Sequence, residues 1–333
     1  MSQGTIFTKV QFGAEASAYG TETSSYSELA RCQSCNIDSD NGNIYDRGLG
    51  EGINASNVYY GPFTASGNIN FDVVDFTVLQ HWVGDKAGAG TAGDPYTLTE
   101  ATSIQAAASG AGIMQPFSIE KLNDDGTDTV QFALGCVGET FTLSGSLNSK
   151  LSCSASFVAQ KSGYRGSGET YTPNTDPAFV MLNGTWKWGA TPSALSGVRE
   201  FSISMANKLV TDTRTIESRF MGIPHFGQRT YNFTVSIIMS SSLATTIISD
   251  FYGYSNAGVY TPEDGSVSVS PTASLEFKVE LVNGSNYATI QLDECAIDRI
   301  SKPAALGGGL SLLSFQGTAL KGLSNIPIKW WST

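Results

Sequence analysis

The stretch SGNINFDVVDFTVLQHWVG, residues 66–84, changes its periodicity halfway along. Residues 68–73 alternate between polar and apolar types, which is typical of a β-strand with one wet face and one buried face. From Phe76 onward, apolar residues recur at three- and four-residue spacing, as on one face of a short helix. The stretch therefore predicts a two-faced strand that leads directly into a helix over 75–84.

The same order of elements recurs in the second half of the chain. A strand expected at 230–239 leads into a helix expected at 241–253, and in both halves a Gly- and Pro-rich loop then precedes a pair of strands. Residue identity between the halves is slight, so the match is one of pattern and spacing. We expect two tandem domains, 1–160 and 179–333, joined by a linker over 161–178.

Most of the remaining chain is rich in β-forming residues. The segments that alternate or are β-rich are 128–136, 139–147, 150–160, 199–206, 274–282 and 287–295. Turn sequences separate them, for example NDDG at 123–126 and NGSN at 283–286. The sequence predicts a mainly β fold of sandwich or barrel type, with one short flanking helix in each half.

Composition limits the classes of partner. Of the 333 residues only 15% are charged, and the formal net charge is −11, so Ser, Thr, Asn and Gly must supply much of the polar surface. A shortage of Lys and Arg argues against a grip on nucleic acid, which depends on cationic side chains. No stretch approaches 18 apolar residues and the first residues lack an export signal, so we expect no membrane insertion and assembly in the cytoplasm.

The cysteines and histidines suggest no catalytic or metal chemistry. Cys32 and Cys35 have the spacing of half a zinc site or of a redox pair, but the surroundings favour buried free thiols. His81, expected on the helix surface or in the core, and His225 both lack a Gly-x-Ser-x-Gly partner. We therefore expect neither an enzyme nor a bound cofactor.

The opening segment QFGAEASAYGTETSSY, residues 11–26, carries a Gly-x-Glu-x-x-x-Tyr-Gly-Thr motif made of Gly13, Glu15, Tyr19, Gly20 and Thr21. It resembles the start of the tail tube proteins, the major tail proteins of tailed bacteriophages. The resemblance implies a structural virion protein in which each tube domain is a β-sandwich flanked by a helix. Strands from six such domains close into an intersubunit β-barrel ring, and the rings stack into a tube through which DNA passes into the host.

Two such domains in one chain would change the number of subunits in the ring. Six domains at two per chain predict a trimeric, pseudo-hexameric ring; the alternative is a true hexamer whose second half is an outer domain. The resemblance also implies partners in the virion tail, namely a tape measure protein, a tail terminator and a distal tail protein. DNA would pass through without specific binding.

A strand that lines such a bore has one face in contact with water, and that face must be polar. The candidates for this lumen-facing role carry neutral hydroxyls and amides apart from one carboxylate, and none is Lys or Arg: Asn68, Asn70, Asp72, Thr230, Asn232, Thr234 and Ser236. The alternative is an ordinary sandwich whose outer face is rich in Ser and Thr.

Two long irregular segments, 39–57 and 210–227, are the candidates for contact between stacked rings. Both mix charges of opposite sign, which favours a repeating interface between identical surfaces. The charged candidates are Asp40, Asp46, Arg47 and Glu51 in the first segment and Asp212, Arg214, Glu217 and Arg219 in the second. The alternative is a pair of mobile surface loops with solvated charges.

A binding module is the rival function. A carbohydrate-binding or adhesin-like β-sandwich on a virion or cell surface would use exposed aromatic side chains to stack on sugars. Tyr59, Tyr60, Tyr164 and Tyr171, all expected in loops, are the residues that would serve it.

Overall fold

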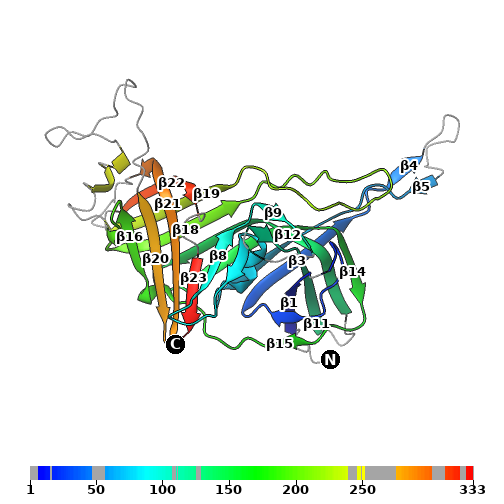
Figure 1. The fold of residues 1–333 in the computed structure, drawn as a ribbon, viewed down its shortest axis with the longest axis horizontal. Helices are drawn as coiled ribbons and strands as arrows, with labels where there is room; N and C mark the ends of the chain where they lie inside the picture. The colour runs from blue at the N-terminus through cyan, green and yellow to red at the C-terminus, as the bar shows by residue number, and fades with distance from the viewer. Residues whose placement is uncertain are drawn as a thin grey trace, which may run out of the picture.

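The protein is mainly β, in a broad molecule from which one hairpin projects as an arm (Figure 1). The computed structural model describes residues 7–15, 17–46, 57–106, 110, 112–124, 129–238, 246–248, 250–251, 275–301, 312–322 and 328–332. Within this part of the chain, no helix is long and apolar enough to cross a lipid bilayer.

Eight antiparallel strands form a central sheet in the spatial order β3, β6, β13, β12, β18, β19, β22, β21. The first four come from the first half of the chain and the last four from the second half. Their bounds are β3 (Cys32–Asp40), β6 (Thr64–Asp72), β12 (Thr129–Ser146), β13 (Ser152–Ala159), β18 (Val198–Ala206), β19 (Thr230–Ile238), β21 (Asn286–Ser301) and β22 (Leu312–Gly322). The pairing of β12 with β18, here called the internal seam, joins the two halves.

Two flanking sheets share the long strands β12 and β21 with the central sheet: the start of each long strand lies in a flanking sheet and its end lies in the central sheet. In the first half, β2 (Tyr26–Glu28), β1 (Phe7–Ala14), β11 (Phe117–Asp124), the start of β12 and β14 (Lys161–Arg165) pair in that order. The other flanking sheet has the order β17 (Ser193–Ala194), β16 (Thr185–Gly189), β20 (Glu276–Asn283), the start of β21, β23 (Ile328–Ser332), β8 (Tyr96–Glu100) and β7 (Gly84–Ala87). Its last two strands, β8 and β7, come from the first half of the chain.

The short elements complete the fold. The arm is the pair β4 (Ile44–Asp46) and β5 (Asn57–Tyr59), and β9 (Ser103–Ile104) pairs with β10 (Ile113–Met114). β15 (Tyr171–Thr172) lies parallel to β2, and two 3₁₀ helices, η1 (Thr77–His81) and η2 (Met181–Asn183), follow β6 and β15.

The structure confirms the repeat that the sequence predicts. β3, β6, β13 and β12 pair in the same spatial order as β18, β19, β22 and β21. In each half a hairpin strand, β11 or β20, precedes the long strand, and a short strand, β14 or β23, pairs with the start of that long strand. The same supersecondary unit therefore occurs twice, while the boundaries of two separate domains stay a prediction.

One apolar core lies behind the central sheet and runs through both halves. Phe71 and Phe141 in the first half and Phe233 and Phe315 in the second are each at most 3% exposed. Burial of one such side chain stabilises a fold by about 1.5–3 kcal/mol. The alternation expected for these strands thus places Ile69, Phe71, Phe233 and Val235 in this core, as predicted.

The expected helices differ from those observed. The helix expected over 75–84 is only the 3₁₀ turn η1, whose start is held by a hydrogen bond of 2.7 Å from the Thr77 amide to Asp75 Oδ1. Its β-branched residues disfavour a longer α-helix. Of the helix expected over 241–253, residues 246–248 and 250–251 are helical and the others lie outside the described residues.

The strands expected at 128–136 and 139–147 form one continuous strand, β12. The turn at 283–286 is confirmed as the tight hairpin between β20 and β21, with Gly284 at a φ of +62°. The turn expected at 123–126 lies partly outside the described residues.

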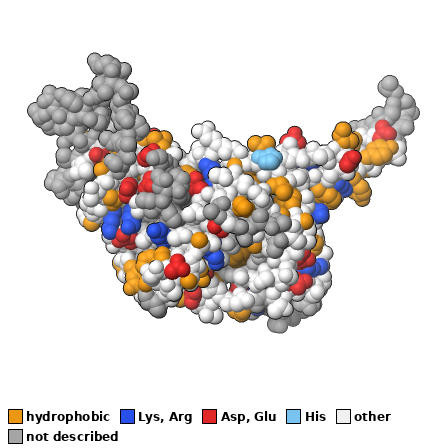
Figure 2. Space-filling view, viewed as in Figure 1, with side chains coloured by type: hydrophobic (Ala, Val, Ile, Leu, Met, Phe, Trp, Pro, Cys, Tyr) orange, Lys and Arg blue, Asp and Glu red, His pale blue; other side chains and the backbone are white. Residues whose placement is uncertain are grey.

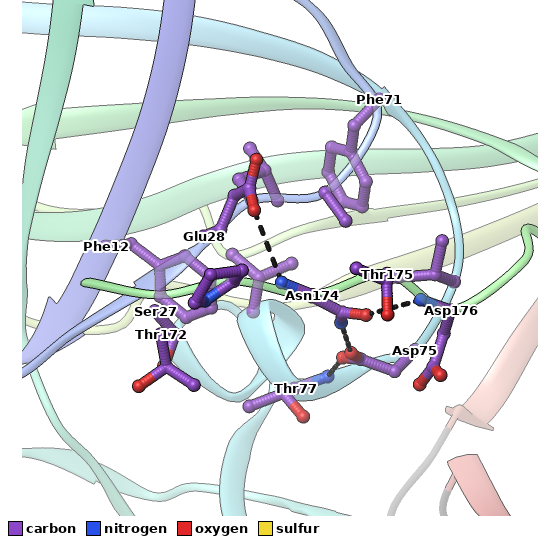
Figure 3. Close-up of a pocket in the computed structure, with 15 residues that line it drawn as sticks. Phe12, Ser27, Glu28, Phe71, Asp75, Thr77, Thr172, Asn174, Thr175 and Asp176 are labelled. Carbon is purple, nitrogen blue, oxygen red and sulfur yellow. Dashed lines mark hydrogen bonds between the residues drawn. The ribbon is translucent and has the colours of Figure 1, made fainter.

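Part of the expected linker belongs to the sheet, and part closes a hollow of about 350 Å³ (Figure 3). Asn174 holds this second part: its amide N–H donates to Glu28 Oε2 at 3.2 Å, and its Nδ2 donates to Asp75 Oδ2 at 2.8 Å. Asp176 in turn donates its amide N–H to the Asn174 side chain. These bonds explain why residues 172–176 lie against the first half of the chain.

Glu15 fixes the bend at which β12 leaves the flanking sheet and enters the central one. Its buried carboxylate accepts hydrogen bonds from the amides of Gly20, at 2.8 Å, and Gly135, at 2.6 Å, and from Ser118 Oγ at 3.0 Å. Gly135 has a φ of +64°, and a Cβ there would lie 3.1 Å from the Tyr19 ring. Burial raises the pKa of Glu15. The motif at residues 13–21 therefore closes around the bend of β12.

Replacing Glu15 with Ala removes the acceptor for three buried donors. Because unpaired buried polar groups are costly, we expect Glu15→Ala to lower the free energy of unfolding by about 3 kcal/mol. Urea denaturation measures this, with Glu217→Ala, an exposed position, as a control expected to stay within about 0.5 kcal/mol of the wild type. A Glu15→Ala protein that unfolds at the wild-type urea concentration would contradict the assigned role.

Candidate assembly surfaces

One face of the central sheet is polar across its strands. In one row Ser34, Asn70, Ser154, Thr142, Ser204, Asn232 and Thr318 lie side by side from β3 to β22. Alternate residues such as Ile69 and Phe233 are buried on the opposite face. We call this surface the polar face; besides that row it includes Asn36, Asn68, Thr140, Ser144, Ser152, Ser156, Ser202, Thr230, Thr234 and Gln316.

The seven lumen-facing candidates all lie on this side of β6 or β19. Asn68, Asn232 and Thr234 are exposed, and Asn70 and Thr230 are half-buried. The other two, Asp72 and Ser236, were expected to face water, yet they are 7% and 3% exposed.

Contacts across strands explain the burial of these two side chains. Asp72 is covered by Lys150 Nζ at 2.7 Å and by Gln33 Nε2 at 2.6 Å. The hydroxyl of Ser236 is hydrogen-bonded to that of Ser314 at 2.6 Å. Such partners lie far away in the chain, so the alternation of one strand could not indicate them.

Small polar side chains on neighbouring strands bond to one another. Asn70 Nδ2 donates to Ser34 Oγ at 2.7 Å, and the hydroxyls of Thr140 and Ser156 are 2.7 Å apart. Sequence reasoning found the polar residues of β6 and β19 and missed those of β3, β12, β13, β18 and β22. The signal was present, because SCSASFVA and VREFSISMA alternate in the same way.

The polar face carries more negative than positive charge among the described residues. Its acidic side chains are Asp38, Asp40, Asp72, Glu139, Glu200 and Asp298, and its basic ones are Lys150 and Arg299. Glu139 and Asp298 are placed there by hydrogen bonds from Ser156 and Thr318. A hollow of about 780 Å³ opens on this face around Ser152 and Thr234. The surface is therefore acidic, and it is hollowed around these residues.

The two outer strands of the central sheet are open. β3 pairs with β6, and residues 295–301 of β21 pair with β22; neither has a second strand partner in the described chain. An open strand edge presents unpaired N–H and C=O groups that can pair with another chain. The Ile37 carbonyl accepts a hydrogen bond from Gln131 Nε2 at 2.8 Å, which covers one such group on β3.

Of the segment 39–57, one of the two expected ring-stacking loops, the described residues 39–46 and 57 belong to the arm and its base. Asp40 ends β3 and Asp46 ends β4, whereas Arg47 and Glu51 lie outside the described residues. The arm exposes apolar side chains, which gather at the upper right of Figure 2. On one side Ile44 pairs with Tyr59, on the other Tyr45 pairs with Val58, and all four are 55–58% exposed. A two-stranded hairpin is only marginally stable in water by itself, and an exposed apolar patch of this kind is typical of a contact surface.

The segment 210–227, the other expected stacking loop, runs from the second half of the chain to the base of the arm (Figure 1). Arg219 Nη2 donates to Asn41 Oδ1 at 2.9 Å, and Arg214 Nη2 donates to the Phe63 carbonyl at 2.9 Å. These two cations therefore bind within the chain, while Asp212 and Glu217 are exposed. The structure brings the two segments together, which the sequence did not indicate.

Three of the four tyrosines expected in loops lie on strands. Tyr59 belongs to β5, Tyr164 to β14 and Tyr171 to β15, and Tyr60 follows β5 directly. Tyr60 is 74% exposed and faces the guanidinium of Arg219, whose Cζ is 5.0 Å from the ring centroid. Tyr59 and Tyr60 thus belong to the arm and its base.

The cysteine candidates and His81 lie in or next to the core, whereas His225 is exposed on the segment 210–227. Burial raises the pKa of Cys32 to about 11 and that of Cys35 to about 12, so both thiols are protonated near neutral pH. His81 is buried, its Nδ1 lies 2.8 Å from the Gln115 carbonyl, and burial lowers its pKa to about 4. His81 is therefore a core residue, one of its two expected settings. Across the described residues, no group of three or more His, Cys, Asp or Glu side chains is placed to hold a metal ion.

Comparison with known proteins agrees with the resemblance of the opening motif. The family model described as "Phage tail tube protein" matches residues 8–319, nearly the whole chain. No curated protein matches. The matched range includes the Glu15 motif, all eight strands of the central sheet up to Ala319 of β22, and the arm. A structural role in the virion tail follows, and the chain belongs to the phage tail tube protein family.

Proposed function

We propose that three copies of this chain close into a pseudo-hexameric ring and that the rings stack into the tube through which phage DNA passes. The observation that carries this proposal is the eight-stranded sheet, which has one polar face, two open edges and the same four-strand unit twice. Three chains of eight strands make a barrel of 24 strands.

The dimensions of such a barrel suit an open channel. Strands lie about 4.8 Å apart, so 24 of them give a circumference of at least ~115 Å and a diameter of ~37 Å. Barrels of about 16–18 strands already enclose aqueous channels. In the alternative, a true hexamer with an outer second half, only the first unit would line the bore; the internal seam, which joins both units in one sheet, favours the trimer.

The polar face suits a bore that must not hold DNA. Duplex DNA carries one negative charge per ~1.7 Å, and proteins that bind it supply Lys and Arg. On this face the side chains are mainly hydroxyls and amides, the acidic groups outnumber the basic ones, and Lys150 is already paired with Asp72. A passing duplex would therefore meet weak repulsion and few phosphate partners.

The arm is our candidate for contact between rings. It projects from the end of β3 and β6, and it offers Ile44, Tyr45, Val58 and Tyr59 to a neighbouring surface. Head-to-tail contacts between identical rings continue without a natural end, as a tube requires. The tape measure, tail terminator and distal tail proteins are the expected partners that would set its length and ends.

Removing apolar side chains from the arm should separate ring closure from stacking. We expect the double variant Ile44→Ser with Tyr59→Ser to stop at single rings with the mass of three 35.2 kDa chains, because the open edges of the sheet are untouched. Native mass spectrometry and negative-stain microscopy measure both properties. Leu182→Ser, which removes an apolar side chain that is 67% exposed outside the arm, is the control and should form tubes.

Two results of this experiment would contradict the proposal. Rings with the mass of six chains would rule out the trimer. Tubes of wild-type length from the arm variant would rule out the arm as the stacking contact.

Cations placed on the polar face should slow DNA passage. Asn70→Lys combined with Asn232→Lys adds two cations per chain in one row, six per ring, to a surface that otherwise offers few. We expect tubes to form normally and the rate of genome delivery to fall by about tenfold, because phosphates would bind the new lysines. Complementation of a phage that lacks the wild-type gene measures delivery.

A matched control keeps the size of the substitution and changes only its charge. Asn70→Gln with Asn232→Gln should deliver DNA at the wild-type rate. If the lysine variant assembles and delivers its genome equally fast, the polar face does not line the bore.

A further inference from the structure

We infer that β21 of one molecule pairs with β3 of the next in the register of the internal seam, so that Arg299 of the first lies opposite Asp40 of the second. This inference rests on the proposed ring and goes beyond it by naming the two edges, the register and a charge pair between subunits.

Matching irregularities align the two repeats residue by residue. The long strands bend where a residue has a positive φ, at Gly135 in β12 and at Glu294 in β21. Each also has a β-bulge, at which one residue has no partner on the adjacent strand. That residue is Glu139 in β12, against β13, and Asp298 in β21, against β22. The two bends are 159 residues apart in the sequence, and so are the two bulges. Each residue of β12 therefore corresponds to the residue of β21 whose number is 159 higher.

The first strands of the two repeats align in the same way. β3 and β18 each have a bulge against the next strand, at Gln33 and Arg199, which are 166 residues apart. The connections that follow, 41–63 and 207–229, have equal length, so β6 and β19 keep the same spacing. β18 therefore corresponds to β3.

The internal seam then supplies the register between molecules. In it Thr140 lies opposite Ala206, and the antiparallel pairing continues to Ser146 opposite Glu200. The corresponding residues place Arg299 opposite Asp40, Ile300 opposite Ser39, and Ser301 opposite Asp38 of the next molecule. Because β21 is the last strand of the second unit and β3 is the first strand of the first, the pairing repeats around a ring.

The chemistry of the two edges agrees with this register. Arg299, Asp38 and Asp40 are exposed, and Arg299 has no ion-pair partner among the described residues. Opposite charges directly across two antiparallel strands stabilise the pairing, and like charges destabilise it. In the internal seam the corresponding pair, Thr140 with Ala206, is uncharged. The charge pair thus belongs to the edges that must find each other in solution, where it favours the correct register.

This pair also accounts for Arg299, since Lys150, the other basic residue of the polar face, is already paired with Asp72. Arg299 lies opposite Gln316 and so on the side that would face DNA. Paired with Asp40 of the next molecule, its charge would be neutralised. A closed ring would therefore hide from DNA a cation that the separate chain exposes.

Charge reversal tests the pair. We expect Arg299→Asp alone and Asp40→Arg alone each to raise the protein concentration needed for half-maximal ring formation by about tenfold or more, because each places like charges together. The combined variant restores the pair in reverse and should return to within about threefold of the wild type. Ala92→Arg, at an exposed position in the loop between β7 and β8, is the control and should form rings normally.

Engineered cysteines test the register itself. Ser301→Cys with Asp38→Cys should give a disulfide between subunits in oxidised rings, since directly opposite Cα atoms lie about 4.5–5.5 Å apart. Ser301→Cys with Asn36→Cys moves one thiol two residues along β3, beyond the reach of a disulfide, and should give none. Ser301→Cys alone controls for the natural thiols of Cys32 and Cys35.

The outcomes separate this inference from the proposed function. If rings form normally but the disulfide forms in the shifted pair, the register is wrong and the ring stands. The same holds if the combined charge reversal does not return ring formation to the wild-type concentration range. A wild-type protein that forms no rings would overturn the ring and this inference together.

Discussion

The alternation of polar and apolar side chains along eight neighbouring strands is the constraint on which the rest of the structure depends. A shift of one residue in any pairing would move a row such as Ile69 and Phe71 out of the core and would bury Asn68 and Asn70. The register of every strand is therefore fixed by the core behind the sheet. The same alternation leaves a broad wet face, and the sheet ends in two strands without outer partners in the described chain.

Each of the two long strands, β12 and β21, has one bend, which lets it belong both to the central sheet and to a flanking sheet. The first is held by Glu15, whose carboxylate accepts hydrogen bonds from the Gly135 amide and from two other donors. The second lies at Glu294, with a φ of +50°. Because the bends lie at corresponding positions, both halves present their four strands in the same way. The pairing of the two units within one chain can therefore be repeated between the chains of a ring.

Much of the fold could be predicted from the sequence, because it depends on local patterns. Alternation found the polar residues of β6 and β19, and turn and spacing patterns found the repeat. The sequence patterns missed contacts between residues far apart in the chain. Examples are the ion pair of Lys150 with Asp72 and the hydrogen bond of Arg219 to Asn41 at the base of the arm. The sequence pattern divided this region into two strands, 128–136 and 139–147, whereas the Glu15 network holds the bend at which β12 stays continuous. The open edges and the exposed arm are properties of the assembled sheet, which no single segment shows.

Hydrogen exchange of the separate chain and of assembled tubes tests most directly whether the sheet is completed by other copies. The account predicts that amides of residues 32–40 in β3 and 296–301 in β21 exchange at least about tenfold more slowly in tubes. Amides of residues 140–146, in the internal seam, should be protected equally in both states. Tubes in which both edges exchange as fast as in the separate chain would contradict the central claim, as would a separate chain whose edges are already fully protected.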